Sequence, residues 1–483
     1  LGAHDLRAFA GINGGTDDAI GLELTGVDFA LALVSEKPAT GNTTQPRLWT
    51  SLQASAESAA FVGVDGLTAQ ADTIAITVNK ASTDGLVVDY SLKAESETER
   101  KTAMTVRTGI DEASSIMFDM DGAEGNLLRA SANLELDMFG FFQVSGGFAI
   151  EKKSAEVVLN DGVVSEVEAE ANAPTELSVD LLTIGGSGVD AFAGMNGGTA
   201  DAIGLQLSDV EFGLALMTEQ VEEGSTAAAR KFTTLKANAG EISFVGVDGI
   251  TASATDLSVE INRGIAGTAG AADVVVDFGY RQLEVLSGPE STIVLDSDGS
   301  LGQLMRASGT LDFNLFNFVS LNGNFAIESS SKEIHLAGVD NATAGEVVQA
   351  NMLTIGGSEV NAFVGINGGT DDAIGLQLAK AEFGLALLSD KDDATRSWTT
   401  LEANAEELSF VGIEGLTASA KDITISINQA GKLNDKVVDY VGTGATDLTI
   451  KTGNTTDLKL SQEGSEGETL KASGNLDIDM FGF

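Results

Sequence analysis

The sequence predicts an all-β protein built as an elongated, solenoid-like stack of tandem β-repeats, and three observations lead to this expectation. One long phrase occurs three times, as AFAGINGGTDDAIGLELTGVDFALAL from Ala8, AFAGMNGGTADAIGLQLSDVEFGLAL from Ala191 and AFVGINGGTDDAIGLQLAKAEFGLAL from Ala362. Apolar residues alternate with a period of two, and no stretch has a convincing helical period. The four prolines all lie in polar, irregular segments. A phrase kept this closely indicates a tandem repeat, and the local period indicates strands.

The repeat unit is roughly 170–180 residues long. It divides the chain into a first unit at 1–190, a second at 191–361 and a partial third at 362–483. No Pro-rich, Gly/Ser-rich or charged linker separates the units, so continuous stacking is expected, with a string of closely apposed β-sandwich domains as the alternative. Because the chain starts and ends inside a repeat, we expect it to be an excerpt from a longer polypeptide, with any export signal outside it.

Each unit divides into three related sub-units of about 57 residues. They are visible when Leu127–Ile150, Leu182–Leu207 and Leu235–Ile261 are compared. Within the repeated phrase, the alternation of apolar residues changes phase near Gly26–Val27, which predicts a β-bulge or corner. Small residues occupy the opposite face of FALAL at 29–33, so this strand is expected to be covered on both sides.

A polar residue stands at the same phase change elsewhere in the repeat. Asp256 and Asp422 occupy this position in two of the copies. A polar side chain at a shared corner predicts a hydrogen bond that fixes the turn.

Composition excludes several classes of function. The formal net charge is −45 and the isoelectric point is near 4.1, so nucleic acid and anionic membrane surfaces are not expected partners. An acidic surface suits solubility, divalent cations or a salty medium. The chain has no cysteine, which excludes disulfides and thiolate chemistry. The longest apolar stretch, Phe139–Ile150, is interrupted by polar residues and glycines and is much shorter than the ~18 residues of a membrane span, so no membrane insertion is expected.

Acidic turns are the best candidate for a metal site. The motif NGGTDD places adjacent carboxylates after a Gly-Gly turn, where they would bind Ca²⁺ together with backbone oxygens. The candidate ligands are Asp17, Asp18, Asp201, Asp371 and Asp372. The alternative is that the preceding threonine and the common aspartate cap the turn through backbone hydrogen bonds.

Two further patterns resemble calcium motifs. GGSGVDAFA at Gly185–Ala193 fits a calcium-binding nonapeptide, but the motif is never repeated in immediate succession, and we interpret it as a glycine-rich turn leading into a strand. D-x-D-G at Asp119–Gly122 and Asp296–Gly299 lacks the other ligands of an EF-hand loop, and we interpret it as an Asp-Gly hairpin turn.

No catalytic constellation recurs between the copies. His4 and His335 have no counterparts in the sister repeats, so neither a zinc site nor a Ser-His pair is supported. Paired acids are expected by chance in a chain with 72 of them, so their spacing does not favour a glycosidase. The sequence therefore predicts that the protein is not an enzyme.

Aromatic residues gather in one segment of each repeat, and we expect them to pack in the core, with a groove for an apolar ligand as the alternative. They are Phe139, Phe141, Phe142, Phe148, Phe313, Phe316, Phe318 and Phe325. The segments that connect the strands differ in length and composition from one repeat to the next, and recognition of a partner would be expected there. The variable segments are Glu36–Leu48, Lys80–Leu86, Glu219–Lys231, Arg263–Asp273, Asp390–Ser397 and Gln429–Lys436.

The phrases LDMFGFFQVSGGFAIEK and AFAGMNGGTADAIGLQLSDVEFGLAL resemble repeats of giant, acidic, cysteine-free exoproteins of Gram-negative bacteria, a class that includes large adhesin-like surface proteins. The resemblance covers nearly the whole chain and implies an extracellular or cell-surface location, with calcium outside the cell assisting folding. It implies a structural repeat protein that forms a rod or filament, as an adhesin shaft or a matrix fibre, through association with neighbouring repeats or chains. The alternative is a calcium- or carbohydrate-binding module, presented on a repeat scaffold, that binds a surface polysaccharide or protein.

Overall fold

The computed structural model describes residues 1–37, 45–111, 114–160, 175–221, 228–267, 274–338, 345–432, 435–442 and 444–482. It is all-β, with 66% strand. The described residues contain no α-helix, and the only helical segments among them are the short 3₁₀ turns η1 (Gly122–Glu124), η2 (Gly299–Leu301) and η3 (Gly464–Glu466). The expectation of an all-β fold is therefore confirmed.

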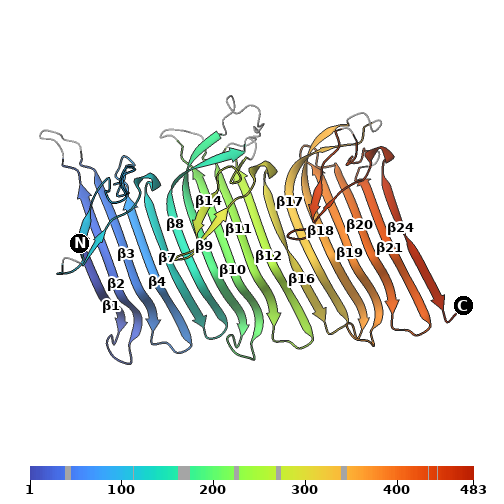
Figure 1. Ribbon diagram of the computed structural model, residues 1–483, viewed down its shortest axis with the longest axis horizontal. Helices are drawn as coiled ribbons and strands as arrows, with labels where there is room; N and C mark the ends of the chain where they lie inside the picture. Colours follow the sequence, from blue (N-terminus) through green and yellow to red (C-terminus); the bar gives the residue numbers. More distant parts are fainter. Residues whose placement is uncertain are drawn as a thin grey trace. The chain divides into compact units, whose positions relative to one another are not determined.

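Long strands make up the main sheet, with the short strand β13 paired to the end of β8, and the other short strands form hairpins that pack on the sheet (Figure 1). The long strands are β1 (Gly2–Ile12), β2 (Ile20–Ser35), β3 (Leu48–Val62), β4 (Leu67–Lys80), β7 (Leu127–Met138), β8 (Phe142–Asn160), β9 (Thr175–Met195), β10 (Ile203–Glu219), β11 (Lys231–Val245), β12 (Ile250–Ile265), β16 (Leu304–Leu315), β17 (Val319–His335), β18 (Val347–Ile366), β19 (Ile374–Asp390), β20 (Ser397–Val411), β21 (Leu416–Ala430) and β24 (Thr469–Met480). The short strands are β5 (Thr105–Arg107), β6 (Ser115–Met117), β13 (Val275–Val276), β14 (Leu283–Leu286), β15 (Thr292–Leu295), β22 (Thr449–Lys451) and β23 (Asp457–Lys459).

The chain divides into two compact units. Unit 1 comprises Leu1–Ala202, Ser208–Lys236 and Arg263–Gly299, and unit 2 comprises Ile203–Leu207, Ala237–Asn262 and Ser300–Phe483. In unit 1 the strands β1, β2, β3, β4, β7, β8 and β9 pair antiparallel in that order. In unit 2 the same meander runs through β12, β16, β17, β18, β19, β20, β21 and β24. Each of the predicted sub-units thus corresponds to two consecutive long strands.

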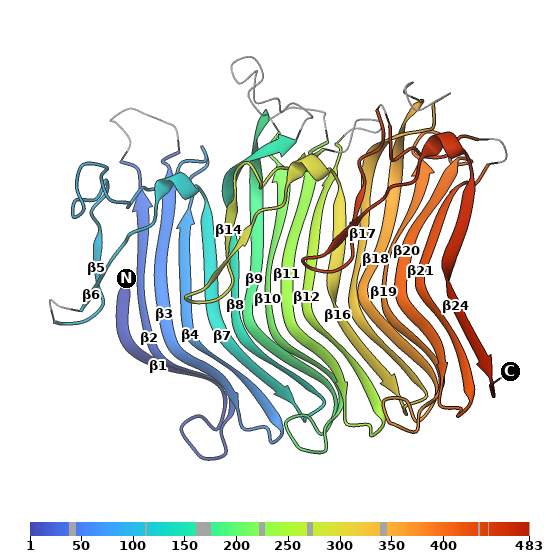
Figure 2. The same ribbon diagram turned by 45° about the vertical axis from the view of Figure 1, so that its right-hand side comes forward.

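β-Bulges interrupt the strands where the sequence changes phase. Gly26, Thr73, Asp256 and Asp422 all have a left-handed backbone, with φ between 52° and 58°. The register shifts at the last three of these positions. At Asp422 the carboxylate accepts a hydrogen bond from Asn475 Nδ2 of the neighbouring strand β24 at 2.9 Å, so its contact runs across the strands and not within the turn. The long strands are bent (Figure 2). A bulge inserts one extra residue and increases the local twist, which favours such a bend.

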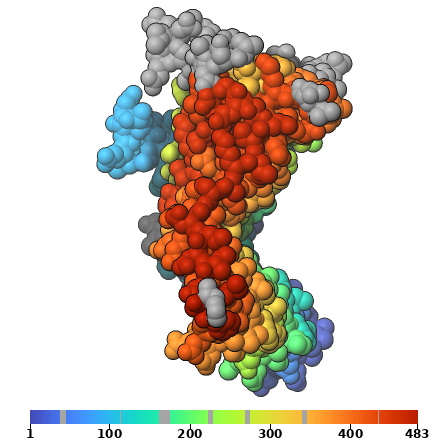
Figure 3. Space-filling view, turned by 90° about the vertical axis from the view of Figure 1, so that its right-hand side faces the viewer, coloured from blue at the N-terminus to red at the C-terminus, as the bar shows by residue number. Residues whose placement is uncertain are grey.

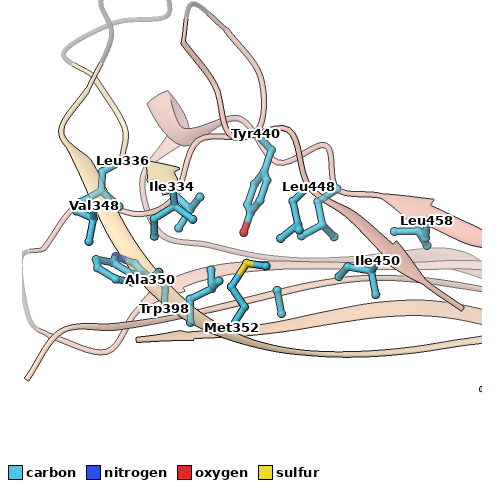
Figure 4. Packing of buried hydrophobic residues seen from close by; sticks show 14 residues of the cluster. Ile334, Leu336, Val348, Ala350, Met352, Trp398, Tyr440, Leu448, Ile450 and Leu458 are labelled. Carbon is cyan, nitrogen blue, oxygen red and sulfur yellow. The ribbon is translucent and has the colours of Figure 1, made fainter. Parts of the chain in front are cut away.

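A hairpin arm covers one face of the sheet in each repeat. The arms are β5–β6, β14–β15 and β22–β23, each formed between the fourth and fifth long strands of its repeat. Beneath each arm lies a cluster of buried apolar side chains. In the cluster under β22–β23, Tyr440, Leu448, Ile450 and Leu458 lie above the sheet side chains of Trp398 and Met352 (Figure 4). These arms were not predicted, because their strands are only three or four residues long, too short for a reliable alternating pattern.

The strand at 29–33 is covered on one side only, which corrects the expectation of cover on both sides. Ala30 is fully buried beneath the β5–β6 arm, whereas Leu33 is 75% exposed on the opposite face. A run of apolar and small residues on both faces was therefore insufficient to predict two covering layers.

The expectation of core packing is wrong for the aromatic residues at the hairpin turns. Phe139, Phe141, Phe316 and Phe318 are all more than half exposed. They lie in three-residue connections, between Met138 and Phe142 and between Leu315 and Val319. Phe139 (φ 56°) and Gly140 (φ 69°) are both left-handed, as at the centre of a type I′ turn. The ring of Phe139 rests on Gly66, where an added Cβ would lie only 2.8 Å from the ring.

Two motif interpretations also change. Gly185–Ala193 lies inside β9 and is not a turn before a strand. The D-x-D-G segments do not form hairpin turns, because Gly122 and Gly299 begin 3₁₀ turns. The backbone N–H groups of these glycines donate to the carboxylates of Asp89 and Asp277, so an acid from a distant segment fixes each turn.

Candidate functional site

The acidic turns connect the first and second long strands of each repeat. In the first copy Thr16 Oγ1 donates to Asn13 O at 2.8 Å, and Asn13 Nδ2 donates to Asp18 O at 3.3 Å. The second and third copies repeat both hydrogen bonds through Thr199 and Thr370. The left-handed asparagine and the glycine two residues later give each turn its shape. The threonine cap that the sequence offered as an alternative is therefore present.

The carboxylates of these turns point away from the core. Asp17, Asp18, Asp201, Asp371 and Asp372 are all exposed. Within the described part of the chain, no group of three or more His, Cys, Asp or Glu side chains is arranged to hold a metal ion. Calcium binding by adjacent aspartates of one turn, with backbone oxygens, stays a prediction.

At the opposite ends of the strands, an arginine closes the base of each variable segment between the second and third long strands. Arg47 donates to both carboxylate oxygens of Glu36 at 3.1 Å. Arg230 donates the same bidentate pair of hydrogen bonds to Glu219, at 2.9 Å. These hydrogen bonds lower the pKa of both glutamates from the ordinary value. The clamps fix the strand ends and leave the segment beyond them free to vary.

The third copy enlarges this clamp. Arg396 donates to Asp435 at 2.9 Å, to Glu346 at 2.8 Å and to Asp390 at 3.2 Å. Its hydrogen bond lowers the pKa of Asp435. The guanidinium also lies 5.2 Å from the ring centroid of Trp398, and Arg47 lies 5.4 Å from that of Trp49. Parts of the variable loops, at 38–44, 222–227, 268–273 and 433–434, lie outside the described residues.

A polar hollow in unit 2 was not predicted from the sequence. It has a volume of about 290 Å³ and is lined by Asn238, Ser258, Glu260, Arg306, Ser308 and Lys451. Arg306 contacts Glu260 at 3.4 Å and Glu328 at 2.7 Å, so its positive charge is compensated. The one sequence feature that could have indicated this hollow is the triplet Arg-Ala-Ser, which begins at Arg306 and occurs at the matching position of the first copy from Arg129. The hollow offers donors and acceptors that suit a polar, uncharged ligand such as a sugar.

The two histidines are in different surroundings. His4 lies in β1, with Nδ1 2.7 Å from Asp28 Oδ1, and is exposed. His335 ends β17, with Nε2 3.6 Å from Glu333. The structure thus places the two histidines in strands of separate units, each next to one acidic side chain.

The described segments hold no helix of the length and apolarity that crossing a membrane requires. No protein-family model matches the chain, and no curated protein matches it in sequence.

Proposed function

We propose that the chain is a structural extracellular repeat protein, a shaft segment in which successive β-repeats are joined into a rod or filament of an adhesin or matrix fibre. The observation that carries this proposal is that the hydrophobic clusters beneath the β14–β15 and β22–β23 arms are each shared between two successive repeats. A bead-like domain would keep its core to itself, whereas a stacked repeat buries apolar surface only together with its neighbour.

The core of unit 2 draws on both sides of the boundary expected at residue 361. Ile334, Val348 and Met352 come from the second repeat. Trp398 and Tyr440 come from the third, and Ile450 of the β22–β23 arm completes the cluster. Neither repeat segment contains this core alone, so separating them would expose it.

The arm of the third repeat also holds the second repeat through polar contacts. Ser358 Oγ lies 3.0 Å from Thr456 Oγ1 and donates to Thr452 O at 3.3 Å. At the tip of the arm, Asn454 Nδ2 donates to Asp256 O in β12. The arm therefore reaches back over the strands of the preceding repeat.

Unit 1 contains the same arrangement one repeat earlier. Ser187 of β9 and Ser291 of the β14–β15 arm bring their hydroxyls to 2.7 Å. The backbone N–H of Asp277 donates to Val158 O at 2.8 Å. The core beneath joins Val179 of the first repeat to Phe232 of the second.

These contacts favour a continuous, solenoid-like stack over a string of separate sandwiches. Strand β18 runs through the boundary expected at residue 361 and pairs with β17 and β19 on its two sides. A string of independent sandwiches would place a linker at this position.

Negative-stain electron microscopy of the purified chain tests the proposal. We expect rigid rods of uniform length, in calcium and in chelator alike, because the contacts that join the repeats are apolar clusters and hydrogen bonds between protein groups. Filaments growing end to end would also support a structural fibre. Compact particles would contradict the stacked arrangement.

The polar hollow favours a second candidate function, binding of a surface carbohydrate by a module presented on the repeat scaffold. Glycan-array binding of the wild-type chain should then be lost in Arg306→Ala and kept in Arg129→Ala, the matching position of the first copy. Equal binding by both variants would count against the hollow as the binding site.

A further inference from the structure

One face of the sheet in unit 2 is apolar over the part of the strands that runs from the acidic turns to beyond the bend. One row of paired residues crosses all eight strands, and every residue in it is apolar. The row consists of Ala252, Phe313, Leu321, Ala362, Leu378, Leu408, Ala420 and Leu476. The next row toward the acidic turns is equally apolar, and it contains Ile250, Leu315, Val319, Val364, Leu376, Phe410, Ala418 and Ile478. Neither row contains a charged residue.

The bulges keep this face apolar beyond the bend. Past the bulge the row consists of Val259, Ala307, Ile327, Ile355, Leu385, Leu401, Ile427 and Leu470. Without the extra residue at Asp256 and Asp422, the strict alternation of a strand would turn the apolar residues to the other face. The phase change in the sequence therefore produces one continuous surface, which we call the apolar face.

The apolar face is open to solvent in the single chain. Val364 is 58% exposed, Leu376 48% and Ile327 45%. The arm β22–β23 packs on the opposite face, where Thr354 and Ala386 lie next to Ile355 and Leu385 along their strands. Figure 3 shows β24 at the near edge of unit 2, where every residue after Thr469 is exposed. A soluble chain rarely exposes a contiguous apolar surface of more than a few hundred Å² unless that surface binds something.

Its dimensions suit a second sheet. The seven spacings of about 4.8 Å between eight strands, and about eleven steps of about 3.3 Å along each strand, give an area of about 1,200 Å². A stable protein interface needs about 800 Å² on each partner. Two copies of one sheet also share the same twist, which lets them pack face to face in an aligned sandwich.

The charge distribution favours a second copy of this chain. The rows described above are uncharged, whereas Glu260, Arg306 and Asp312 lie on the opposite face of β12 and β16. Two apolar faces can therefore meet without placing like charges against each other, even though each chain carries −45. An acidic membrane surface would repel the same chain.

The face also offers a place for a side chain of the partner. A hollow of about 260 Å³ opens among Ala254, Leu257, Gly309, Leu311, Phe325 and Ile327. It exists because Gly309 has no side chain, and a Cβ there would lie 2.8 Å from Leu257 Cδ2. A large apolar side chain of an opposing sheet would fill it, as at the centre of well-packed interfaces.

We propose that the apolar face is a homotypic interface, on which a second copy of this chain packs its own apolar face to complete a two-layer β-sandwich. The inference rests on the proposed structural role and adds the partner and the surface through which chains associate laterally. Pairing is expected to strengthen with ionic strength, because salt screens the repulsion between two strongly acidic chains.

Sedimentation velocity of the whole chain over a range of concentrations tests this. We expect a species of about twice the chain mass of 49.6 kDa, which Leu376→Glu converts to the single chain. The matched control is Gln377→Glu, which adds the same charge at the next residue of β19 on the opposite face. A wild-type chain that stays single at all concentrations and salt levels, or equal loss of pairing in both variants, would overturn the proposal.

A second measurement does not depend on how Leu376→Glu folds. Because the chain has no cysteine, Ile327→Cys and Gln377→Cys each carry one environment-sensitive fluorophore. The emission of the label at 327 should shift to the blue as concentration rises, and the label at 377 should not respond. A shift at 327 only on phosphatidylcholine vesicles would assign the face to lipid and overturn the proposal. Rods in the electron microscope without pairing would contradict this inference alone, whereas compact particles would contradict the proposed function.

Discussion

Trp398 shows how a single side chain stabilises the contact between repeats. It is 1% exposed, and its Nε1 donates to Lys436 O at 2.8 Å. Trp398→Ala should reduce the free energy of unfolding by about 3–5 kcal/mol, since it removes a buried aromatic ring and leaves a cavity. Urea unfolding followed by circular dichroism measures this loss. Trp49→Ala is the matched control, because Trp49 makes the same hydrogen bond, to Leu86 O at 2.9 Å, in a less buried position and should cost less.

Asp89 is expected to make the first repeat sensitive to acid. Burial raises the pKa of its carboxyl group, but hydrogen bonds from Ser91, Lys101 and Gly122 outweigh burial and hold the pKa well below 3.8. A group whose pKa is lowered on folding stabilises the fold above its unfolded pKa, and this stabilisation is lost as the pH falls. Asp89→Asn should therefore lower the melting temperature at neutral pH, with the difference from wild type narrowing below about pH 4. A difference that stays constant down to pH 2 would contradict this role for the carboxylate.

At the scale of elements, the sequence was sufficient for the strands and their bulges but not for the arms. The strands are long and alternate strictly, so their period survives in the sequence, and the phase change at Asp256 marks a real bulge. The arms take their shape from tertiary contacts instead. Gly185 and Gly356 illustrate such contacts, because the backbone of an arm passes so close to each of them that a Cβ would not fit. The sequence alone does not show which segment makes this close approach.

Gly356→Ala tests how the arm is seated. An added Cβ would lie 2.2 Å from Lys451 O, so the β22–β23 arm must move away from β18. Displacing a packed element in this way costs about 1–3 kcal/mol. Amide hydrogen exchange in residues 449–459 should accelerate in this variant. Gly474→Ala is the control, because its nearest backbone contact is 3.3 Å and the first repeat has Ala132 there. Equal exchange in the two variants would show that the arm does not depend on this crossing.

The sequence was sufficient to predict the acidic turns but not the polar hollow or the apolar face, and the reason is physical. Turn chemistry is local, so NGGTDD was sufficient to predict the cap that Thr16 forms. The polar hollow joins Arg306 to Lys451, which are far apart in sequence and meet only because the arm reaches back over the preceding repeat. The uncovered apolar face was missed for the opposite reason. Apolar residues on both sides of a strand indicate that both sides are suited to burial, not that both are buried in one chain.

At the scale of the whole molecule, the net charge of −45 and the acidic turns make separable predictions about cations. Sodium chloride should raise the melting temperature by screening repulsion between the acids, whatever their position. If the turns bind Ca²⁺, calcium chloride at the same ionic strength should raise it further, since carboxylate and backbone oxygens are the ligands that this ion prefers. Replacing Asp371 and Asp372 by alanine should then reduce the extra increment and leave the sodium response unchanged. Calorimetry of the wild type and the double variant in the two salts measures these melting temperatures. If the extra rise with calcium survives the double substitution, the calcium effect belongs to the acidic surface as a whole and not to this turn.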